Sequence, residues 1–260
     1  MNRARLGSAL ALAAGATLLA ACGAGGKKLV TPTTTGNAAA QPATTGSPPV
    51  ATVPNYHPRI DPANFTNRIT NRYFPLAPGR TQRYNGKRDG IPTQHVMRVT
   101  RATKTVMGVR CLVISDIVTQ NHSLVEKTTD WYAQDTSGSV WYFGEDTAEY
   151  QNGVVTSTQG TWEAGVDRAF PGIVMPAVPK VGRTYQQEYR PGVALDRATV
   201  LATNTTVRVP AGTFRHVVVT FDKNPLDPSK KERKYFAPGV GFVRAVLHGG
   251  GHTELTWLVR

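Results

Sequence analysis

Residues 56–260 alternate between apolar and polar side chains for most of their length, and this period of two constrains the fold more than any other feature of the chain. Thr93 to Val106, Cys111 to Thr119 and Phe214 to Phe221 are rich in β-branched residues, which favour strands. Apolar stripes of helical period are absent from this part of the sequence, and Pro-Gly, Asn-Gly and Gly-Gly pairs interrupt the runs. The pattern predicts an all-β fold: a single antiparallel domain, either a strongly curved sheet or an up-and-down barrel of about ten strands.

Three segments between the predicted strands have a distinctive composition. Asp135-Thr-Ser-Gly138 separates two apolar runs, and its glycine is able to take the positive φ of a hairpin turn. In Val209-Pro-Ala-Gly-Thr-Phe214 the proline and glycine predict a tight turn, with the outer valine and phenylalanine entering the core. Residues 160–182 combine aromatic residues, an Ile-Val-Met cluster and three prolines. That composition favours a long crossing loop, either a structural lid over one end of the domain or a functional loop.

The first 22 residues predict export and lipid attachment. After a start that carries two arginines, Leu6 to Leu18 is an apolar run, and Leu19-Ala-Ala-Cys22 resembles a bacterial lipobox. The apolar run is too short and wrongly flanked for a spanning helix. Residues 1–21 are therefore expected to be a cleaved signal peptide, with a diacylglyceryl group on the Cys22 thiol. The alternative is an ordinary signal that happens to end in cysteine and releases a soluble protein.

Residues 22–55 differ in composition from everything that follows. Gly, Ala, Thr and Pro dominate, and few side chains are available to build a core. Such a segment cannot bury enough apolar surface to offset the entropy of ordering it. The chain therefore divides into a signal peptide (1–21), a disordered tether that begins at the lipidated Cys22 (22–55) and an antiparallel β domain (56–260). The lipid bilayer, either the cell membrane or an outer membrane, is the expected partner of Cys22.

The chain is strongly basic, with 30 Lys and Arg residues against 17 Asp and Glu residues and a formal net charge of +13. Its basic residues are scattered along the predicted strands, and no nucleic-acid-binding module is recognisable. An anionic envelope polymer or anionic lipid headgroups are therefore nearer candidates for a partner than nucleic acid. The alternative is a solvated basic surface with no single ligand.

Cys111 is the second of two cysteines, so it has no disulfide partner once Cys22 carries lipid. It lies in an apolar, strand-like run with no neighbouring histidine in sequence. We expect it to be a small buried hydrophobic residue and not a catalytic thiol.

Several motifs between Val106 and Val243 are distinctive as a set. They are Trp131-Tyr-Ala-Gln-Asp135, Gly138-Ser-Val-Trp-Tyr-Phe-Gly-Glu145, Gly160-Thr-Trp-Glu-Ala-Gly165, Pro171-Gly-Ile-Val-Met-Pro176, Val209-Pro-Ala-Gly-Thr-Phe214 and Tyr235-Phe-Ala-Pro-Gly-Val-Gly241. Together they resemble a group of uncharacterised bacterial exported proteins and lipoproteins, some of which are distantly similar to domain-of-unknown-function and TapB-like envelope proteins. The resemblance implies an antiparallel β domain in the envelope and carries no catalytic residue over.

The densest acidic segment of the chain consists of Asp130, Asp135, Glu145, Asp146 and Glu149. The last three offer oxygen ligands for a hard cation such as calcium, but no Asp-x-Asp-x-Asp-Gly loop is present. A solvated, salt-bridged hairpin is the simpler expectation, and we expect neither a metal site nor a cofactor. The sequence also lacks the nucleophile elbow, the zinc protease motif, the P-loop and the dinucleotide fingerprint.

The histidine pair His248-Gly-Gly-Gly-His252 predicts a hairpin tip, because three consecutive glycines do not form a helix.

Three classes of function remain open. The first is a non-catalytic envelope lipoprotein that binds a hydrophobic or amphipathic ligand in a β cavity. The second is a structural or interaction protein of the cell surface. The third, ranked last, is a hydrolase of envelope polymers, which needs at least two carboxylates in one cleft. The candidate ligand-binding residues are Trp131, Trp141, Phe143, Trp162 and Phe170, and the candidate carboxylates are Asp135, Glu145, Asp146, Glu149, Glu163 and Asp167.

Overall fold

The computed structural model describes residues 56–259, so Cys22, the predicted signal peptide and the predicted tether lie outside the described residues. Within this part of the chain, the helical content is a single 3-10 turn, η1 (Pro62–Asn64). No helix there has the length and apolar character that crossing a membrane requires. The strands are β1 (Phe65–Thr66), β2 (Thr81–Arg88), β3 (Ile91–Val106), β4 (Val109–Gln120), β5 (Ser123–Asp135), β6 (Val140–Gln151), β7 (Val154–Ser157), β8 (Trp162–Glu163), β9 (Phe170–Met175), β10 (Thr184–Gln186), β11 (Glu188–Tyr189), β12 (Arg197–Val209), β13 (Gly212–Asn224), β14 (Asp227–Ala237), β15 (Gly241–Leu247) and β16 (His252–Val259).

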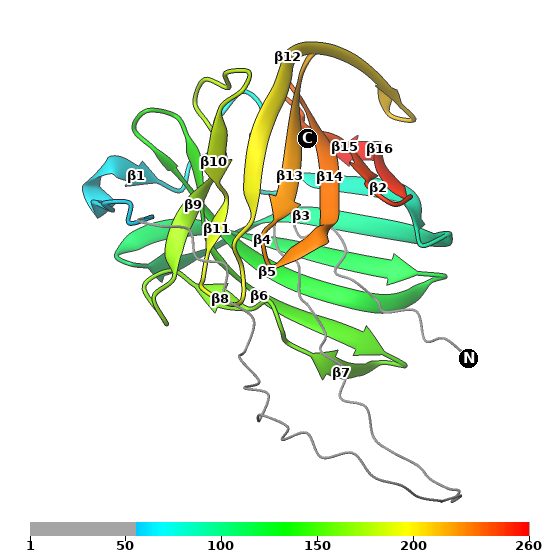
Figure 1. Cartoon of the computed structure of the whole chain (residues 1–260), viewed down its shortest axis with the longest axis horizontal. Coiled ribbons are helices and arrows are strands. Elements are labelled where there is room, and N and C mark those ends of the chain that lie inside the picture. The colour runs from blue at the N-terminus through cyan, green and yellow to red at the C-terminus, as the bar shows by residue number, and fades with distance from the viewer. Residues whose placement is uncertain (1–55, 260) are drawn as a thin grey trace, which may run out of the picture.

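The strands form one antiparallel sheet, which confirms the predicted fold class (Figure 1). Its strand order is β10-β12-β13-β14-β15-β16-β2-β3-β4-β5-β6-β9-β11, and β1, β7 and β8 add to this path at β5 and β6. The sheet has 16 strands, more than the ten or so that the sequence predicted. Five of them, β1, β7, β8, β10 and β11, are only two to four residues long. Most sequential neighbours pair as hairpins, whereas β2, the first long strand, pairs with β16, the last.

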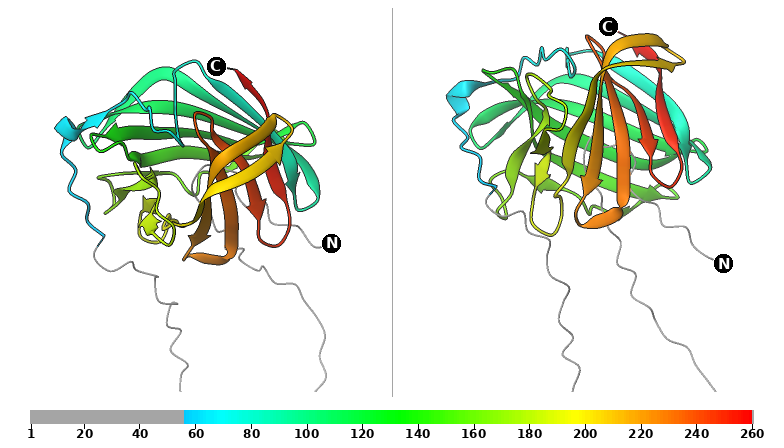
Figure 2. Two further views of the ribbon diagram at one scale, coloured as in Figure 1. Left: turned by 90° about the horizontal axis from the view of Figure 1, so that it is seen from above. Right: turned by 45° about the horizontal axis from the view of Figure 1, so that its top comes forward.

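The sheet curls until its two ends share one segment of chain. In β10, Thr184 pairs with Thr199 of β12, and just beyond Gln187 the residue Glu188 of β11 pairs with Pro171 of β9. Gly172 of β9 makes this approach feasible, because an added Cβ would lie 2.2 Å from the carbonyl oxygen of Gln187. The result is a nearly closed, barrel-like sheet, in which the green β4–β6 and the orange β13 and β14 form opposite walls (Figure 2).

One end of the barrel is sealed by residues 69–80. The Asn71 side chain donates to the Gly138 carbonyl in the β5–β6 turn at 2.8 Å, and the Gly239 amide in the β14–β15 turn donates to the Arg72 carbonyl at 2.7 Å. The segment therefore bridges two turns that belong to opposite walls. The buried Arg80 guanidinium donates to the Val240 carbonyl at 2.6 Å and holds the same end closed.

An apolar core fills the half of the barrel next to this seal. Phe74 enters it from the sealing segment, and its ring centroid lies 5.5 Å from that of Tyr132 and 6.3 Å from that of Phe236. Inward residues of β3 and β4 such as Val99, Leu112 and Ile114 are almost entirely buried. Burial of this apolar surface supplies most of the driving force for folding.

The predicted turns are present, but the predicted crossing loop is only partly correct. Gly138 takes a φ of 95° in the hairpin between β5 and β6, and His248 to Gly251 form the tip between β15 and β16. Residues 170–175, however, form β9 and pair with both β6 and β11. The prolines at 171 and 176 do not prevent this, because they fall at the ends of the strand, where a missing N–H is tolerated. Residues 69–80, not 160–182, cover the end of the barrel.

Cys111 is fully buried on β4 and forms no disulfide in the described part of the chain, which confirms its predicted character. Burial raises the pKa of its thiol to about 12, so the sulfur stays protonated and unreactive at neutral pH.

The turn between β12 and β13 allows a test of backbone strain. Val209 pairs with Gly212, and Gly212 has a φ of 139° with open space around the position of an added Cβ. Gly212→Val should therefore destabilise the domain by about 1 to 3 kcal/mol through strain alone. Chemical denaturation measures this change. Ala211→Val, at the exposed neighbouring position, is the control and should change stability by less than about 0.5 kcal/mol; equal effects of the two substitutions would contradict the explanation.

Candidate functional site

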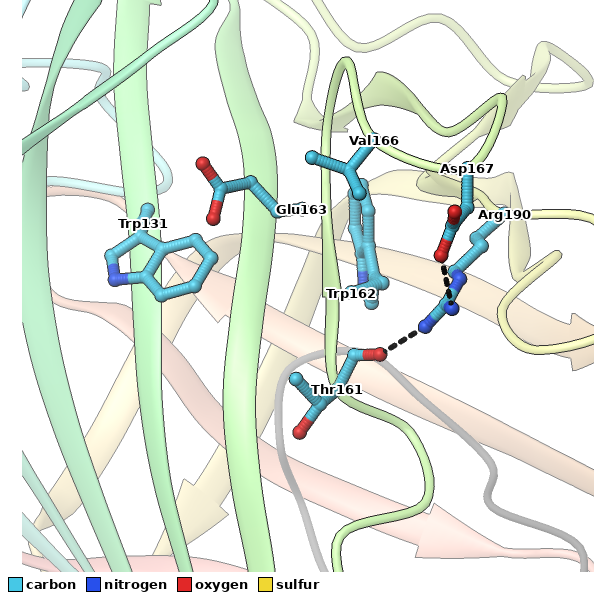
Figure 3. Close-up of a pocket in the computed structure, with 7 residues that line it drawn as sticks. All are labelled: Trp131, Thr161, Trp162, Glu163, Val166, Asp167 and Arg190. Carbon is cyan, nitrogen blue, oxygen red and sulfur yellow. Dashed lines mark hydrogen bonds and ion pairs between the residues drawn. The ribbon is translucent and has the colours of Figure 1, made fainter.

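Two of the predicted aromatic residues and two of the predicted carboxylates line one surface pocket (Figure 3). Its volume is about 170 Å³, smaller than the range of about 300 to 1,000 Å³ that is usual for drug-sized ligands. Trp131 comes from β5, and most of the other lining residues come from the segment at and after β8. The lining residues are Trp131, Thr161, Trp162, Glu163, Val166, Asp167 and Arg190.

The charged groups of this pocket are engaged with one another. Lys104 Nζ lies 2.7 Å from Glu163 Oε2 and 3.5 Å from the centroid of the Trp131 ring. Arg190 binds Asp167 at 2.8 Å and donates to the Thr161 carbonyl at 2.5 Å. Both carboxylates would have to leave an ion pair to act as acid, base or nucleophile, so the pocket offers little support for the hydrolase hypothesis.

The other three predicted aromatic residues lie elsewhere. Trp141 and Phe143 pack against Phe65, with ring centroids 6.0 and 5.5 Å apart. Phe170 packs edge to face against His57 at 4.7 Å. The structure therefore brings only Trp131 and Trp162 together in one pocket. The other three hold the N-terminal residues of the described chain against the sheet.

A second group of polar residues lies inside the barrel, on the side away from the seal. Asp116 on β4, Asp130 on β5, Glu145 on β6 and Glu188 on β11 are all buried, and we refer to them as the interior carboxyl cluster. The register aligns them, because Asp130 lies opposite Glu145 and belongs to the same inward face as its other neighbour, Ile114. Four different strands thus direct acidic side chains toward one region of the interior.

A bulge in β6 determines which side chains face this region. Trp131 pairs with Gly144 but Tyr132 pairs with Tyr142, so one extra residue is accommodated on β6. Gly144 takes a φ of 134° there, as glycine often does in bulges. Because of the bulge, Tyr142 and Glu145 both point inward although they are three residues apart. The Tyr142 hydroxyl donates to Asp130 Oδ1 at 2.5 Å.

Much of the hydrogen-bonding capacity of the cluster is unused by the protein. Both carboxyl oxygens of Glu145 and of Glu188 lack a hydrogen-bond partner among the described residues, and the exposure of each residue is 0%. The second oxygen of Asp130 also lacks a hydrogen-bond partner among these residues. Asp116 Oδ1 lies 3.1 Å from His95 Nε2, close enough for an ion pair but not aligned as a hydrogen bond. Buried polar groups in folded proteins almost always have partners.

The charges of the opposite wall are paired. Lys234 Nζ on β14 lies 3.1 Å from Asp222 and 3.1 Å from Glu232. The Thr220 hydroxyl donates to the other oxygen of Asp222 at 2.6 Å. Burial disfavours the charged form of Lys234, but the two carboxylates outweigh that effect and raise its pKa. The Lys234 ammonium group therefore pairs with two acids of its own wall.

Burial and mutual repulsion favour the neutral form of the cluster. Burial raises the pKa of Glu145, and the charges of Glu188 and Asp130 raise it further. The pKa values of Asp130 and Glu188 are raised for the same reasons. Burial also raises the pKa of Asp196, which acts on Glu188, to about 7. Burial and the neighbouring acids therefore favour the neutral carboxylic acid over the carboxylate at Asp130, Glu145 and Glu188.

Charged side chains from distant strands meet at the end of the barrel away from the seal. Glu126 on β5 and Glu232 on β14 both act on Arg88 of β2, and Lys230 on β14 is also close enough to act on Arg88. The polarity of the interior thus increases from the apolar seal, through the carboxyl cluster, to a ring of mixed charge.

Sequence reasoning noted Asp130 and Glu145 but assigned them to a solvated hairpin, and this interpretation is wrong for both residues. It missed Asp116 and Glu188 entirely. The signal was present for Asp116, which alternates in step with Ile114 and Val118 and therefore shares the apolar face of its strand. Of the other acidic candidates, Asp135 accepts from the Ser139 amide in its turn at 2.9 Å, while Asp146 is exposed on the outer face and Glu149 is half-buried.

No three His, Cys, Asp or Glu side chains between residues 56 and 259 are grouped closely enough to hold a metal ion. Comparison with models of known protein families finds no match, and comparison with curated proteins finds none either. Among solved structures, the chain is similar to a proposed lipoprotein from Parabacteroides distasonis, with 14% sequence identity and a TM-score of 0.39. That similarity covers 72% of this chain and 98% of the other. The family resemblance described from the motifs stays a prediction.

The buried carboxyls predict an unusual dependence of stability on pH. A group whose pKa is raised on folding keeps its proton in the native state after the unfolded state has lost it, so stability falls as pH rises above the unfolded pKa of about 4.3. Glu145→Gln mimics the protonated acid and should remove this loss, which is at most about 1.4 kcal/mol per pH unit for one group. Thermal melts from pH 5 to pH 8 should show the variant gaining stability over the native protein as pH rises.

Asp146→Asn is the matched control for that measurement, because Asp146 is the next residue on β6 and faces outward. The difference in melting temperature between this variant and the native protein should stay constant across the same pH range. A difference for Glu145→Gln that is equally flat would mean that Glu145 titrates like an exposed carboxyl.

Proposed function

We propose that this chain is an exported, lipid-anchored, non-catalytic protein of the cell envelope whose β domain binds a small polar ligand in its interior. One observation carries the ligand-binding part of the proposal. Glu145 and Glu188 are completely buried, and none of their four carboxyl oxygens has an aligned hydrogen-bond donor in the described protein. The Tyr142 hydroxyl acts on Glu145 but donates to Asp130.

Burying carboxyl groups without hydrogen-bond partners lowers the stability of the fold. A buried polar group without a partner costs roughly 1 to 3 kcal/mol, and more when it is charged. Replacing these residues with apolar ones of similar size would remove that cost. Local departures from good packing of this kind are typical of functional sites. A polar ligand that supplies the missing partners accounts for their presence.

The position of the cluster favours a polar ligand over an apolar one. Sequence analysis favoured a hydrophobic or amphipathic ligand held by aromatic residues. Trp162 and Phe143 are instead buried in the core, and Trp131 lies under Lys104 in the small surface pocket. The unsatisfied groups of the interior include carboxyl, phenol, amide, imidazole and indole groups, which a hydrocarbon chain cannot satisfy.

A second candidate function, adhesion to an anionic surface, is favoured by the distribution of charge. The buried charged residues comprise six acidic residues but only two basic ones, apart from His95. Because the interior removes more acids than bases from the surface, the exterior is more basic than the net charge of the whole chain suggests. Such a surface attracts anionic lipid headgroups or acidic wall polymers, and ligand binding inside the barrel is compatible with it.

Cys22 supports the anchoring part of the proposal through its place in Leu19-Ala-Ala-Cys22. Cys22→Ala should abolish lipid attachment, because only the thiol accepts the diacylglyceryl group. Fractionation of the cells should then move the protein from the membrane to the soluble fraction. Cys111→Ala is the control and should leave the protein in the membrane. Retention of the Cys22 variant in the membrane after a high-salt wash would contradict lipid anchoring.

Native mass spectrometry of the full chain, purified from its own host in mild detergent, tests the proposed binding function. We expect a small polar molecule bound in a ratio of one to one. It should be lost or weakened in the Glu145→Gln variant and retained in Asp146→Asn. A mass equal to that of the lipidated chain alone, together with no binding from a library of polar metabolites, would overturn the proposal.

A further inference from the structure

We propose that the interior carboxyl cluster is a receptor for a small organic cation, an amine or a quaternary ammonium group. This inference rests on the proposed binding function and specifies the chemical class of the ligand. The geometry that carries it is the convergence of Asp116, Asp130, Glu145 and Glu188 from four different strands, with no basic side chain bonded to the last three.

The pairing of the strands brings these groups together. Asp130 lies directly opposite Glu145, and Asp116 is two residues along β4 from Ile114, the other neighbour of Asp130. Glu188 pairs with Pro171 of β9, and the next residue of β9 pairs with Tyr142 of β6. Four carboxyls around one region create a strongly negative potential as soon as any of them ionises, and a cation is the ligand that such a potential selects.

Among the described residues, no basic side chain forms a hydrogen bond with the carboxyl oxygens of Glu145 or Glu188 or with the second oxygen of Asp130. Lys234 acts on Glu188, but its ammonium group binds Asp222 and Glu232 at 3.1 Å each. His95 lies beside Asp116 and stacks on Tyr84, with ring centroids 5.0 Å apart. Asp130, Glu145 and Glu188 are therefore left for a cation that comes from outside the chain.

Tyrosine side chains provide an independent observation that points to the same ligand class. Tyr132 and Tyr142 stack at 4.6 Å beside Asp130, and the Tyr132 hydroxyl is buried without a hydrogen-bond partner among residues 56–259. Aromatic rings next to carboxylates are how proteins hold alkylammonium groups, through cation–π attraction and apolar contact.

Binding of the cation should release protons. Burial favours the neutral form of the carboxyls without ligand, whereas a bound ammonium group stabilises their ionised form. The reaction is therefore a carboxylic acid plus a cation giving a carboxylate–cation pair, with the proton passing to solvent. Affinity rises with pH, because a higher pH removes the released proton. The titratable groups that face the cluster from neighbouring elements are His95, Glu126, Tyr132, Tyr142, Asp196 and Lys234.

Isothermal titration calorimetry tests this exchange on the full chain, after dialysis at pH 5 to remove any bound cation. The probes are methylammonium, 1,4-diaminobutane and choline, with 3,3-dimethyl-1-butanol as the uncharged analogue of choline. At least one cation should bind, and its heat should differ between buffers of different ionisation enthalpy by the amount that about one released proton requires. Its affinity should rise from pH 6 to pH 7, and the uncharged analogue should bind at least about tenfold more weakly.

Variants locate the site. Glu145→Gln and Glu188→Gln should each weaken binding of the cation by at least about tenfold, whereas Asp146→Asn should leave it unchanged. Thermal melts of the same samples verify folding, and Glu145→Gln is expected to be the more stable protein above pH 7. A cation that binds with the same affinity to Glu145→Gln and Glu188→Gln would show that it binds elsewhere and would overturn the inference.

The outcomes separate this inference from the proposed function. If native mass spectrometry finds a neutral polar molecule and no cation binds, the binding function stands and the cation inference fails. If neither a co-purified molecule nor a cation is found, both fail. Cation binding without proton release would show that the carboxyls are already ionised without ligand and would overturn the proposed proton exchange.

Discussion

A strand directs every second side chain to the same face of its sheet, and in a sheet that nearly closes on itself that face has no solvent. The rest of this structure depends on that constraint. An apolar residue at an inward position contributes to the core, as Val99, Leu112 and Ile114 do. A polar residue there must find its partners among other inward residues or among molecules that enter the barrel. The division of the interior into an apolar half and a carboxyl-rich half follows from which residues occupy the inward positions.

The two halves have different physical roles. The apolar half, with its Phe74 seal, buries the surface that stabilises the fold. The polar half costs stability, because it places acids that repel one another in a medium of low polarity. A domain that tolerates this cost must be supported by the rest of its core. The surface also differs from the overall composition of the chain, because six acidic residues are buried but, apart from His95, only two basic ones.

Alternation and turn residues were sufficient to predict the fold class, the hairpin at Gly138 and the tight turn at Gly212, because these are local properties. The candidate site was harder to predict. The bulge at Gly144 shifts the alternation of β6, so the inward position of Glu145 cannot be counted from its neighbours. Glu188 joins the cluster because β11 pairs with β9, whereas β10, the strand just before it, pairs with β12. Lys234 and Asp222 meet only after two long strands adopt their register. None of these long-range relations is encoded in a short window of sequence.

The pairing of β2 with β16 has a consequence for how the chain reaches this structure. Almost every other long strand can form a hairpin with its neighbour as soon as both are available, but β2 finds its second partner only when the final strand is present. Contacts between the two extremes of a sequence carry the largest loop-closure entropy and slow folding. Until then β2, whose inward residues include Tyr84 and Gln82, lacks a neighbouring strand on one side. The barrel therefore closes only when β16 is available to pair with β2, and removal of β16 would leave β2, the first long strand, as an open edge.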